Sequence, residues 1–194
     1  MNIAILILAA GSSTRMGTTK QLLKLGDSTL LGQVINNCSQ TNADSLSVVL
    51  GSESDKIKSE LPSSTHIIIN PDYRDGLSTS IKSGVNALQK KDAICVVLGD
   101  QPLVDVAYLN EMIAKSKTYP NQIIASTYGR RNGVPAIFPK KYYQKLQSLS
   151  DDKGAKRLLN NELEQVIVMD KPVDLFDVDT PLDYILISKN KLES

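Results

Sequence analysis

The sequence is poor in the residues that carry much of protein catalysis and transition-metal binding. Its 194 residues contain no tryptophan, one histidine and two cysteines. The one histidine, His66, suits a strand end better than a catalytic role, which argues against a histidine-based triad, and the few histidines and cysteines argue against a zinc site. His66 precedes the apolar residues 67–69, which favours a place at the end of a strand. Any chemistry is therefore expected to rest on carboxylates, lysine, arginine and a hard metal ion.

Charge of one sign and long apolar runs are also scarce. The net charge is +1, so no strong field attracts nucleic acid or an anionic membrane. No stretch reaches the roughly 18 apolar residues of a membrane span, and the short N-terminal run lacks the preceding basic residues of a signal peptide. Cys38 and Cys95 lie in apolar surroundings, which is typical of reduced core residues. We expect one globular domain over residues 1–194, in the cytoplasm, without nucleic-acid or membrane partners.

Strand-like and helix-like patterns alternate along the chain. The continuous apolar runs Ile3–Leu8 and Ala93–Leu98 are typical of strands buried on both faces. Such alternation predicts a mostly parallel sheet between helices, and two strand patterns around the polar turn Tyr128–Gly133 predict an antiparallel excursion. Other strands are expected at Leu46–Leu50, His66–Ile69, Gln122–Thr127, Val134–Phe138 and Gln165–Met169. Helices are expected around Leu30–Cys38, at Asp55–Leu61, from Ser78 as N-cap, at Val106–Ile113, Tyr142–Leu149 and Ala155–Asn160, and from Pro181.

The first apolar run opens into a loop rich in glycine, hydroxyl groups and positive charge, with the sequence Leu8-Ala9-Ala10-Gly11-Ser12-Ser13-Thr14-Arg15-Met16-Gly17 followed by Lys20. Glycine lets the backbone approach a ligand, N–H groups point at oxygens, and the basic side chains neutralise charge. The loop follows the carboxyl end of a strand, where α/β sheets bind ligands. Its spacing matches neither a Walker A loop nor a dinucleotide fingerprint. We expect a phosphate-binding loop of another kind; the alternative is a polar connection without a ligand.

A carboxylate follows the other buried apolar run, in Val96-Val97-Leu98-Gly99-Asp100-Gln101-Pro102. Mg²⁺ keeps several waters and takes only one or two protein carboxylates together with substrate phosphates, so Asp100 suits a magnesium ligand. The alternative is an aspartate that caps a helix in an ordinary strand–turn–helix connection.

Three further polar segments are candidates. Phe176-Asp177-Val178-Asp179-Thr180-Pro181 would place Asp177 and Asp179 on one side of a strand, if it forms one, with Asp183 in the following helix. The loop 70–80 leads into a helix N-terminus and suits an anion or a nucleobase. The basic tracts Arg130-Arg131-Asn132-Gly133 and Lys153-Gly154-Ala155-Lys156-Arg157 could meet an anionic acceptor, or could be solvated surface.

The pattern Leu-Ala-Ala-Gly-x-Ser-x-Arg-Met-Gly-x-x-Lys over residues 8–20, together with Gly99-Asp100-Gln101-Pro102, resembles the signature of nucleotidyltransferases that activate sugars and cofactors. Within them it is most similar to the molybdenum cofactor cytidylyltransferase type of the MobA-like NTP transferase family. The resemblance implies a Rossmann-like three-layer α/β/α fold, with Asp100 and Asp179 holding Mg²⁺ or Mn²⁺ and Asp177 supporting them. It implies Arg15, Lys20 and Asp100 as catalytic residues. It implies nucleotide contacts from Leu8, Ala9, Ala10, Gly11, Ser12, Gly17, Lys20, Gly76, Ser78 and Ser80.

The implied reaction transfers CMP from CTP to the phosphate of molybdenum-bound molybdopterin, with release of pyrophosphate. The product would serve a molybdoenzyme of the xanthine dehydrogenase type. Ala9-Ala10-Gly11 favours CTP, since guanylyl relatives tend to carry Ala-Gly-Gly. Gly133-Val134-Pro135 departs from the Gly-His-Pro of many relatives, which leaves the acceptor open. Two alternatives therefore stand: a sugar-phosphate or polyol-phosphate nucleotidyltransferase, and a non-catalytic nucleotide-binding chaperone for a molybdoenzyme. A glycosyltransferase is disfavoured because the Asp-x-Asp pair lies near the C-terminus.

Overall fold

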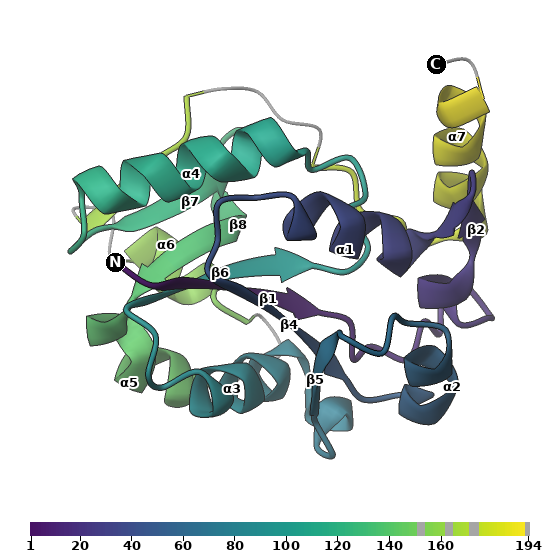
Figure 1. The fold of residues 1–194 in the computed structure, drawn as a ribbon, viewed down its shortest axis with the longest axis horizontal. Coiled ribbons are helices and arrows are strands. Elements are labelled where there is room, and N and C mark those ends of the chain that lie inside the picture. Colours follow the sequence, from purple (N-terminus) through teal and green to yellow (C-terminus); the bar gives the residue numbers. More distant parts are fainter. Residues whose placement is uncertain (151–153, 162–164, 171–174, 193–194) are drawn as a thin grey trace.

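A central sheet lies between two layers of helices in the computed structural model, which describes residues 1–150, 154–161, 165–170 and 175–192 (Figure 1). The three-layer α/β/α, Rossmann-like expectation is confirmed. In the described part of the chain the main sheet has seven strands, in the order β5-β4-β1-β6-β8-β7-β9. These strands are β1 (Ile3–Leu8), β4 (Ser45–Leu50), β5 (His66–Ile69), β6 (Ala93–Leu98), β7 (Ile123–Thr127), β8 (Asn132–Pro139) and β9 (Val166–Val168).

One strand runs against the others. β8 pairs antiparallel with both β6 and β7, whereas the β1–β4, β1–β6, β4–β5 and β7–β9 pairs are parallel. This confirms the mostly parallel sheet with an antiparallel excursion. The strand β8 begins at Asn132, two residues before the predicted Val134, because the turn closes early: the Tyr128 N–H donates to the Arg131 carbonyl at 2.8 Å.

The central position of β1 decides where the functional segments meet. Leu8 at its end is in register with Val49 of β4 and Leu98 of β6. The pairing continues past the strands, since the Ala9 N–H donates to the Val49 carbonyl and the Gly99 N–H to the Leu8 carbonyl, both at 2.9 Å. The segments that leave these three strands therefore share one edge of the sheet, the usual ligand-binding edge of an α/β fold.

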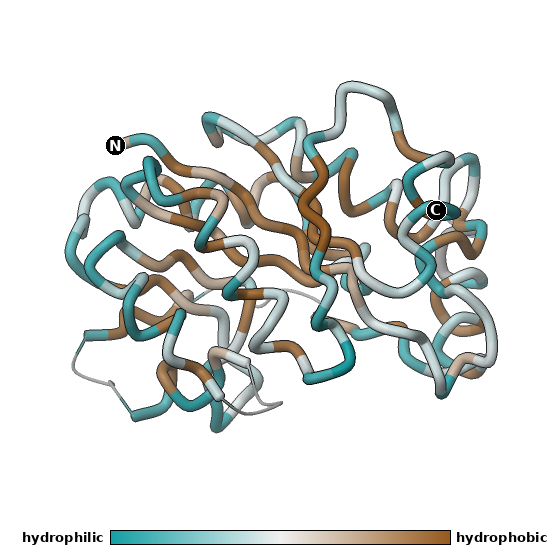
Figure 2. The backbone as a smooth tube through the Cα atoms, turned by 90° about the horizontal axis from the view of Figure 1, so that it is seen from below, coloured by the Kyte–Doolittle hydropathy of each residue, from teal (hydrophilic) through white to brown (hydrophobic). Residues whose placement is uncertain are grey.

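The core divides into two clusters, one on each face of the sheet. Residues of one face of β1, such as Ile5, pack with α1 and α4, whereas Leu6 on the other face packs with α3 and α5. Figure 1 shows α1 and α4 on one side of the sheet and α3 and α5 on the other. Figure 2 shows the hydrophobic strands running through the middle with hydrophilic turns outside. Burial on both faces explains why β1 and β6 lack alternation.

Short polar side chains start two of the helices. The Thr29 side chain accepts a hydrogen bond from the Gly32 N–H at the start of α1, and Asp105 accepts one from the Tyr108 N–H at the start of α4. The helices are α1 (Leu30–Ser39), α2 (Ser54–Ser59), α3 (Leu77–Ala87), α4 (Val106–Thr118), α5 (Tyr143–Gln147), α6 (Lys156–Asn161) and α7 (Pro181–Leu192), with 3-10 turns η1 (Lys20–Leu22), η2 (Tyr73–Asp75) and η3 (Lys140–Tyr142).

The structure corrects three local expectations. Ser78 is not the N-cap of α3: the N-cap is Gly76, with φ 100°, and Ser78 lies buried in the first turn. Glycine suits that left-handed backbone, so the helix begins without a side-chain cap. Residues 175–179 form no strand, so their two aspartates are placed by loop contacts. A hairpin of β2 (Lys24–Leu25) and β3 (Ser28–Thr29) was not predicted, because each strand has only two residues.

The two cysteines lie in the core as expected. Cys38 and Cys95 are buried free thiols, and burial raises the pKa of the Cys95 thiol to about 12. A thiol with so high a pKa carries little thiolate at neutral pH, so it is unreactive. Among the described residues, no helix combines the length and apolar character needed to cross a membrane.

We expect the Gly84→Ala variant to be less stable by about 1–3 kcal/mol, because overpacking a core costs about that much. A Cβ at Gly84 would overlap the side chain of Leu6, where α3 crosses β1. This clash outweighs the ~1 kcal/mol that alanine gains over glycine in a helix. Chemical denaturation with Ser83→Ala as the neighbouring control measures the difference. Equal or higher stability of Gly84→Ala would show that the interface has room for a methyl group.

Candidate active site

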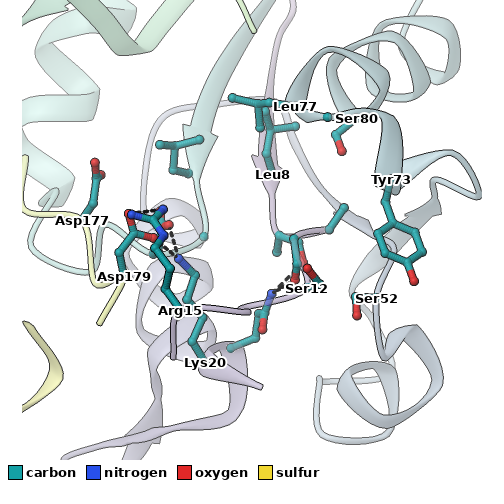
Figure 3. Close-up of a pocket in the computed structure, with 18 of the residues that line it drawn as sticks. Leu8, Ser12, Arg15, Lys20, Ser52, Tyr73, Leu77, Ser80, Asp177 and Asp179 are labelled. Atoms are coloured by element: carbon teal, nitrogen blue, oxygen red, sulfur yellow. Dashed lines mark hydrogen bonds and ion pairs between the residues drawn. The ribbon is translucent and has the colours of Figure 1, made fainter. Parts of the chain in front are cut away.

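A cavity of about 780 Å³ opens at the carboxyl edge of the sheet. Figure 3 shows side chains converging on it from the first loop, from the 70–80 segment and from the C-terminal loop. Its polar and charged lining is spread over both ends, with Asp177, Asp179 and Arg15 on one side and Tyr73 and Ser52 on the other. The lining comprises Leu8, Ala9, Ala10, Gly11, Ser12, Arg15, Lys20, Gln21, Ser52, Glu53, Tyr73, Arg74, Gly76, Leu77, Ser80, Leu98, Gly99, Asp100, Lys156, Asp177 and Asp179.

The first loop has its carbonyl groups engaged and its N–H groups available. Gln21 Nε2 donates to the carbonyls of Ala9 and Gly11 at 3.1 and 3.0 Å, and the Ser52 N–H donates to the Ala10 carbonyl at 3.1 Å. Within the described ranges, the N–H groups of residues 11–15 have no protein acceptor. Consecutive N–H donors without a protein acceptor, next to basic side chains, are the arrangement that anion-binding loops use.

Gln21 holds this loop in shape, and the sequence analysis missed it. Its side chain is only 3% exposed, and its Oε1 accepts a hydrogen bond from Ser13 Oγ at 3.2 Å. Ser13 itself has φ 54°, a left-handed backbone that the loop needs for its tight course. Gln21 follows Lys20 directly, so one short 3-10 turn, η1, presents both the loop brace and the cavity lysine.

Lys20 bridges two aspartates that are 79 residues apart in the chain. Its Nζ lies 2.6 Å from Asp100 Oδ2 and 2.7 Å from Asp179 Oδ1. Arg15 Nη2 lies 2.9 Å from Asp179 Oδ2. The Lys20 side chain is 13% exposed, against 70% for Arg15, so only the lysine is held in a largely enclosed position.

The C-terminal loop reaches this cluster through one backbone bond and one apolar contact. The Val178 N–H donates to the Asp100 carbonyl at 3.0 Å. Val178 itself belongs to a small buried cluster, which also contains Ile187 from α7 and three residues from the N-terminal part of the chain, Met16, Leu25 and Leu30. Packing on both sides of Asp179 therefore fixes it beside the first loop. Asp183 accepts hydrogen bonds from the Thr180 side chain and N–H, so it stabilises the start of α7, as expected.

The surroundings keep Lys20 charged. Burial lowers the pKa of Lys20, but attraction to Asp100 and hydrogen bonds to Asp100 and Asp179 outweigh it and raise the pKa above its usual value. A basic group whose pKa is higher in the folded protein than in the unfolded chain stabilises the fold. Its full contribution is present below the unfolded-state pKa and is lost only as the pH rises through the folded-state pKa. The bridge therefore persists throughout the neutral range.

The carboxylates around Lys20 fit a hard divalent ion. Asp100 Oδ1 is buried and has no hydrogen-bond partner among the described residues, so it is an acceptor with free capacity. The described residues contain no cluster of three or more histidine, cysteine or acidic side chains that could hold a metal ion alone. Asp100 and Asp179 fit an ion such as Mg²⁺ that completes its shell with water and phosphate oxygens.

A second hydrogen-bonded chain links the cluster to the β7–β8 turn. Gln101, which is fully buried, donates through Nε2 to Asp177 Oδ1 at 2.7 Å and to the Tyr128 hydroxyl at 2.6 Å. The Tyr128 hydroxyl donates to the Val134 carbonyl at 2.6 Å, and burial raises the Tyr128 pKa to about 12. Asp177 also lies close to Asp100, and burial with that negative charge raises its pKa. These hydrogen bonds connect the carboxylates around Lys20 to the strand that carries Val134.

The structure brings most of the predicted site residues together and leaves two aside. Gly17 and Ser78 do not line the cavity: Gly17 lies exposed beyond the loop, and Ser78 is buried in α3. Arg130 and Arg131 lie exposed in the β7–β8 turn, and Lys153 falls outside the described residues. The cavity also contains Ser52 and Glu53, which the sequence analysis missed. The sequence feature that could have indicated them is their position directly after the buried strand β4.

This arrangement can bind a polyanion and stabilise charge on it. Free N–H groups and two cations lie on one side of the cavity, beside two carboxylates that could hold a divalent ion. Phosphoryl transfer depends on such positioning and charge neutralisation, and it needs no histidine.

Comparison with known proteins finds relatives of similar sequence. Purine catabolism protein PucB of Bacillus subtilis is 26% identical over 195 aligned positions, which cover 94% of each chain. The bifunctional protein GlmU of Pseudomonas putida is 30% identical over 139 residues, covering 71% of this chain but 30% of GlmU. This chain therefore matches less than a third of the length of that relative.

Solved structures with a similar fold match this chain over nearly its whole length. The crystal structure of a Mycobacterium tuberculosis rv0371c homolog from Mycobacterium sp. strain JC1 has a TM-score of 0.87 at 29% identity, covering 98% of this chain and 97% of the other. Rv0371C of Mycobacterium tuberculosis H37Rv in complex with manganese has a TM-score of 0.82 at 27% identity, covering 97% and 98%. The family model of the MobA-like NTP transferase domain matches residues 5–166, so this chain belongs to the MobA-like NTP transferase domain family.

Proposed function

We propose that this chain transfers CMP from CTP to the phosphate of molybdenum-bound molybdopterin. The observation that carries the proposal is one cavity that holds both an anion-binding loop and the Lys20–Asp100–Asp179 cluster. An oxygen of the acceptor phosphate forms a bond to the α-phosphorus, the bond from that phosphorus to the α,β-bridging oxygen breaks, and pyrophosphate leaves. The acceptor phosphate is already ionised at neutral pH, so the reaction needs no general base.

The residues of the first loop bind and orient the triphosphate in this proposal. The N–H groups of residues 11–15 contact phosphate oxygens, since these donors have no protein acceptor within the described residues. Arg15 and Lys20 stabilise the negative charge that develops on the leaving pyrophosphate. The Lys20 ammonium then exchanges part of its contact with the aspartates for contact with phosphate.

Asp100 and Asp179 would hold Mg²⁺ or Mn²⁺. The free acceptor capacity of Asp100 Oδ1 supports this assignment, and so does the similar Rv0371C structure in complex with manganese. A divalent ion at these carboxylates would neutralise charge on an α-phosphate oxygen. Asp177 orients the cluster through its hydrogen bond from Gln101, and it binds no metal in this proposal.

The choice of CTP rests on the shape of the loop where it leaves β1. Ala9 and Ala10 line the cavity with small side chains, and a single methyl group at a pocket wall shifts base preference by about 1–3 kcal/mol. The same cavity wall includes Gly76 and Ser80 from the start of α3, which were expected to contact the nucleotide.

A sugar-phosphate or polyol-phosphate acceptor is the second candidate. Val134 replaces the histidine of many relatives on β8, and its carbonyl is tied to Tyr128 and thereby to Gln101. The acceptor side therefore differs from the family pattern at a position linked to the site. A non-catalytic chaperone for a molybdoenzyme remains the alternative of another class, and pyrophosphate release separates it from both enzymes.

We expect pyrophosphate release with CTP and Mg²⁺ that depends on molybdenum cofactor, at a rate at least about tenfold higher than with GTP, ATP or UTP. A coupled pyrophosphate assay with each triphosphate, with and without cofactor, measures this. Release that depends on a sugar phosphate instead would favour the second candidate. Tight nucleotide binding without release for any acceptor would favour the chaperone.

A further inference from the structure

The basic side chains that line the cavity differ in whether they are already paired. Four basic residues line it: Arg15, Lys20, Arg74 and Lys156. Arg15 and Lys20 form ion pairs with aspartates, whereas Arg74 and Lys156 form none with the described residues. Arg74 lies 5.7 Å from the centroid of the Tyr73 ring, and Figure 3 shows Tyr73 on the side of the cavity away from Asp177 and Asp179. Among these four, Lys156 is therefore the one with neither an ion pair nor an aromatic ring contact to the described residues.

Lys156 lies at the start of α6, and three contacts fix that helix. Asn160 Oδ1 accepts from the Asn132 N–H, and Asn160 Nδ2 donates to the Asn132 carbonyl, both at 3.0 Å. Leu158 and Leu159 pack into the core. The preceding Gly154 has φ 56° and sits so close to Leu77 that a Cβ would lie 2.8 Å from Leu77 Cδ2. The backbone of α6 is thus clamped to β8 and α3 with Lys156 at the cavity.

The clamp places Lys156 beside the start of β8. β8 runs antiparallel to β6, with Ala136 opposite Val96, so the start of β8 extends beyond the end of β6 toward Asp100. Asn132, which holds α6, is at that start. Lys156 and Asp177 line the same cavity, and Asp177 connects to β8 through Gln101 and Tyr128.

The balance of acidic and basic side chains in the cavity indicates a role for Lys156. Three aspartates, Asp100, Asp177 and Asp179, line the cavity, and its cations Arg15 and Lys20 form ion pairs with Asp100 or Asp179. An anionic acceptor that approached carboxylates alone would be repelled. A further cation that has no carboxylate partner among the described residues offsets this repulsion and supplies a charge-assisted hydrogen bond to a phosphate.

We propose that Lys156 binds the anionic group of the acceptor, a phosphate monoester, and is a specificity-determining residue for that substrate. The inference rests on the proposed nucleotidyl transfer, because only that reaction places a second phosphate beside the nucleotide. It assigns the triphosphate to Arg15, Lys20 and the first loop, and the acceptor phosphate to Lys156. Arg130 and Arg131, exposed in the nearby turn, play no direct part.

The test measures binding of inorganic phosphate to protein preloaded with Mg²⁺ and α,β-methylene-CTP, whose α–β linkage cannot be cleaved. Calorimetry compares the unchanged protein with Lys156→Gln, Lys156→Arg and the control Lys140→Gln. Lys140 is exposed on η3 and lies outside the cavity. We expect Lys156→Gln to weaken phosphate binding about 10- to 100-fold. Lys156→Arg should retain binding, Lys140→Gln should match the unchanged protein, and all should bind the analogue alike.

Each other outcome overturns the inference. Equal phosphate binding in Lys156→Gln would remove Lys156 from the acceptor site. Weaker binding of the analogue in that variant would assign Lys156 to the nucleotide. Absence of phosphate binding to the unchanged, preloaded protein would show that no acceptor-phosphate site exists. Failure of the proposed function is distinct, because the unchanged protein would then fail to bind the analogue, or would bind it but release no pyrophosphate from CTP with molybdenum cofactor.

Discussion

Replacing Asp100 by asparagine is expected to lower the rate of nucleotidyl transfer by about 10²- to 10³-fold, the usual cost of losing one charge-stabilising group at a reacting centre. The amide keeps the size of the carboxylate but loses the charge that would hold a divalent ion. The amide also replaces one of the two carboxylate oxygens by an NH₂ group, which donates and cannot accept. In Asp100, Oδ2 accepts from Lys20 Nζ at 2.6 Å and Oδ1 has no partner among the described residues. Pyrophosphate release with CTP and Mg²⁺ measures the effect.

The fold of Asp100→Asn should persist, because Lys20 keeps its ion pair with Asp179 at 2.7 Å. We expect the free energy of unfolding to fall by no more than about 1–2 kcal/mol, since the pair is partly exposed. The matched control is Asp55→Asn, an exposed aspartate in the first turn of α2, which should retain full activity. Near-normal turnover of Asp100→Asn with a normal melting curve would contradict the metal assignment.

Replacing Lys20 by methionine is expected to reduce transfer by at least about 100-fold, because the triphosphate loses its enclosed cation. The same change removes the cation shared by Asp100 and Asp179. Two neighbouring carboxylates without it repel each other, so the metal-free variant should be less stable than the unchanged protein. Mn²⁺ should then raise the melting temperature of Lys20→Met more than that of the unchanged protein, because an ion bound only to the folded state stabilises it.

Thermal denaturation with and without Mn²⁺ separates these roles. The control is Lys115→Met, which breaks the ion pair with Asp170, a residue whose side chain is 95% exposed. Such a surface pair contributes only about 0–1 kcal/mol, and its loss should not alter the response to Mn²⁺. If Lys20→Met lost stability but transferred CMP at the normal rate, Lys20 would be a structural residue. If Mn²⁺ stabilised both proteins equally, the two aspartates would not share the ion.

Local sequence patterns predicted many of the strands and helices of the fold. The strands β1 and β6 were predicted from continuous apolar runs, because a strand covered on both faces needs apolar residues at every position. The helices α1 and α3 followed from apolar spacing. Predictions failed where no local pattern exists: the hairpin β2–β3 is too short for one, and the N-cap of α3 depends on the backbone of Gly76.

By itself the sequence determined the glycine-rich first loop, the strand-end position of Asp100 and the three-layer fold, since each follows from patterns of residues close together in the chain. Only the tertiary structure decided that Lys20 bridges Asp100 and Asp179, that Gln21 braces the loop, and that Lys156 joins the cavity. These contacts depend on the place of β1 between β4 and β6, on the packing of α7 against the first loop, and on the clamp of α6 to β8. Their physical reason is packing between segments far apart in sequence, which no local periodicity encodes.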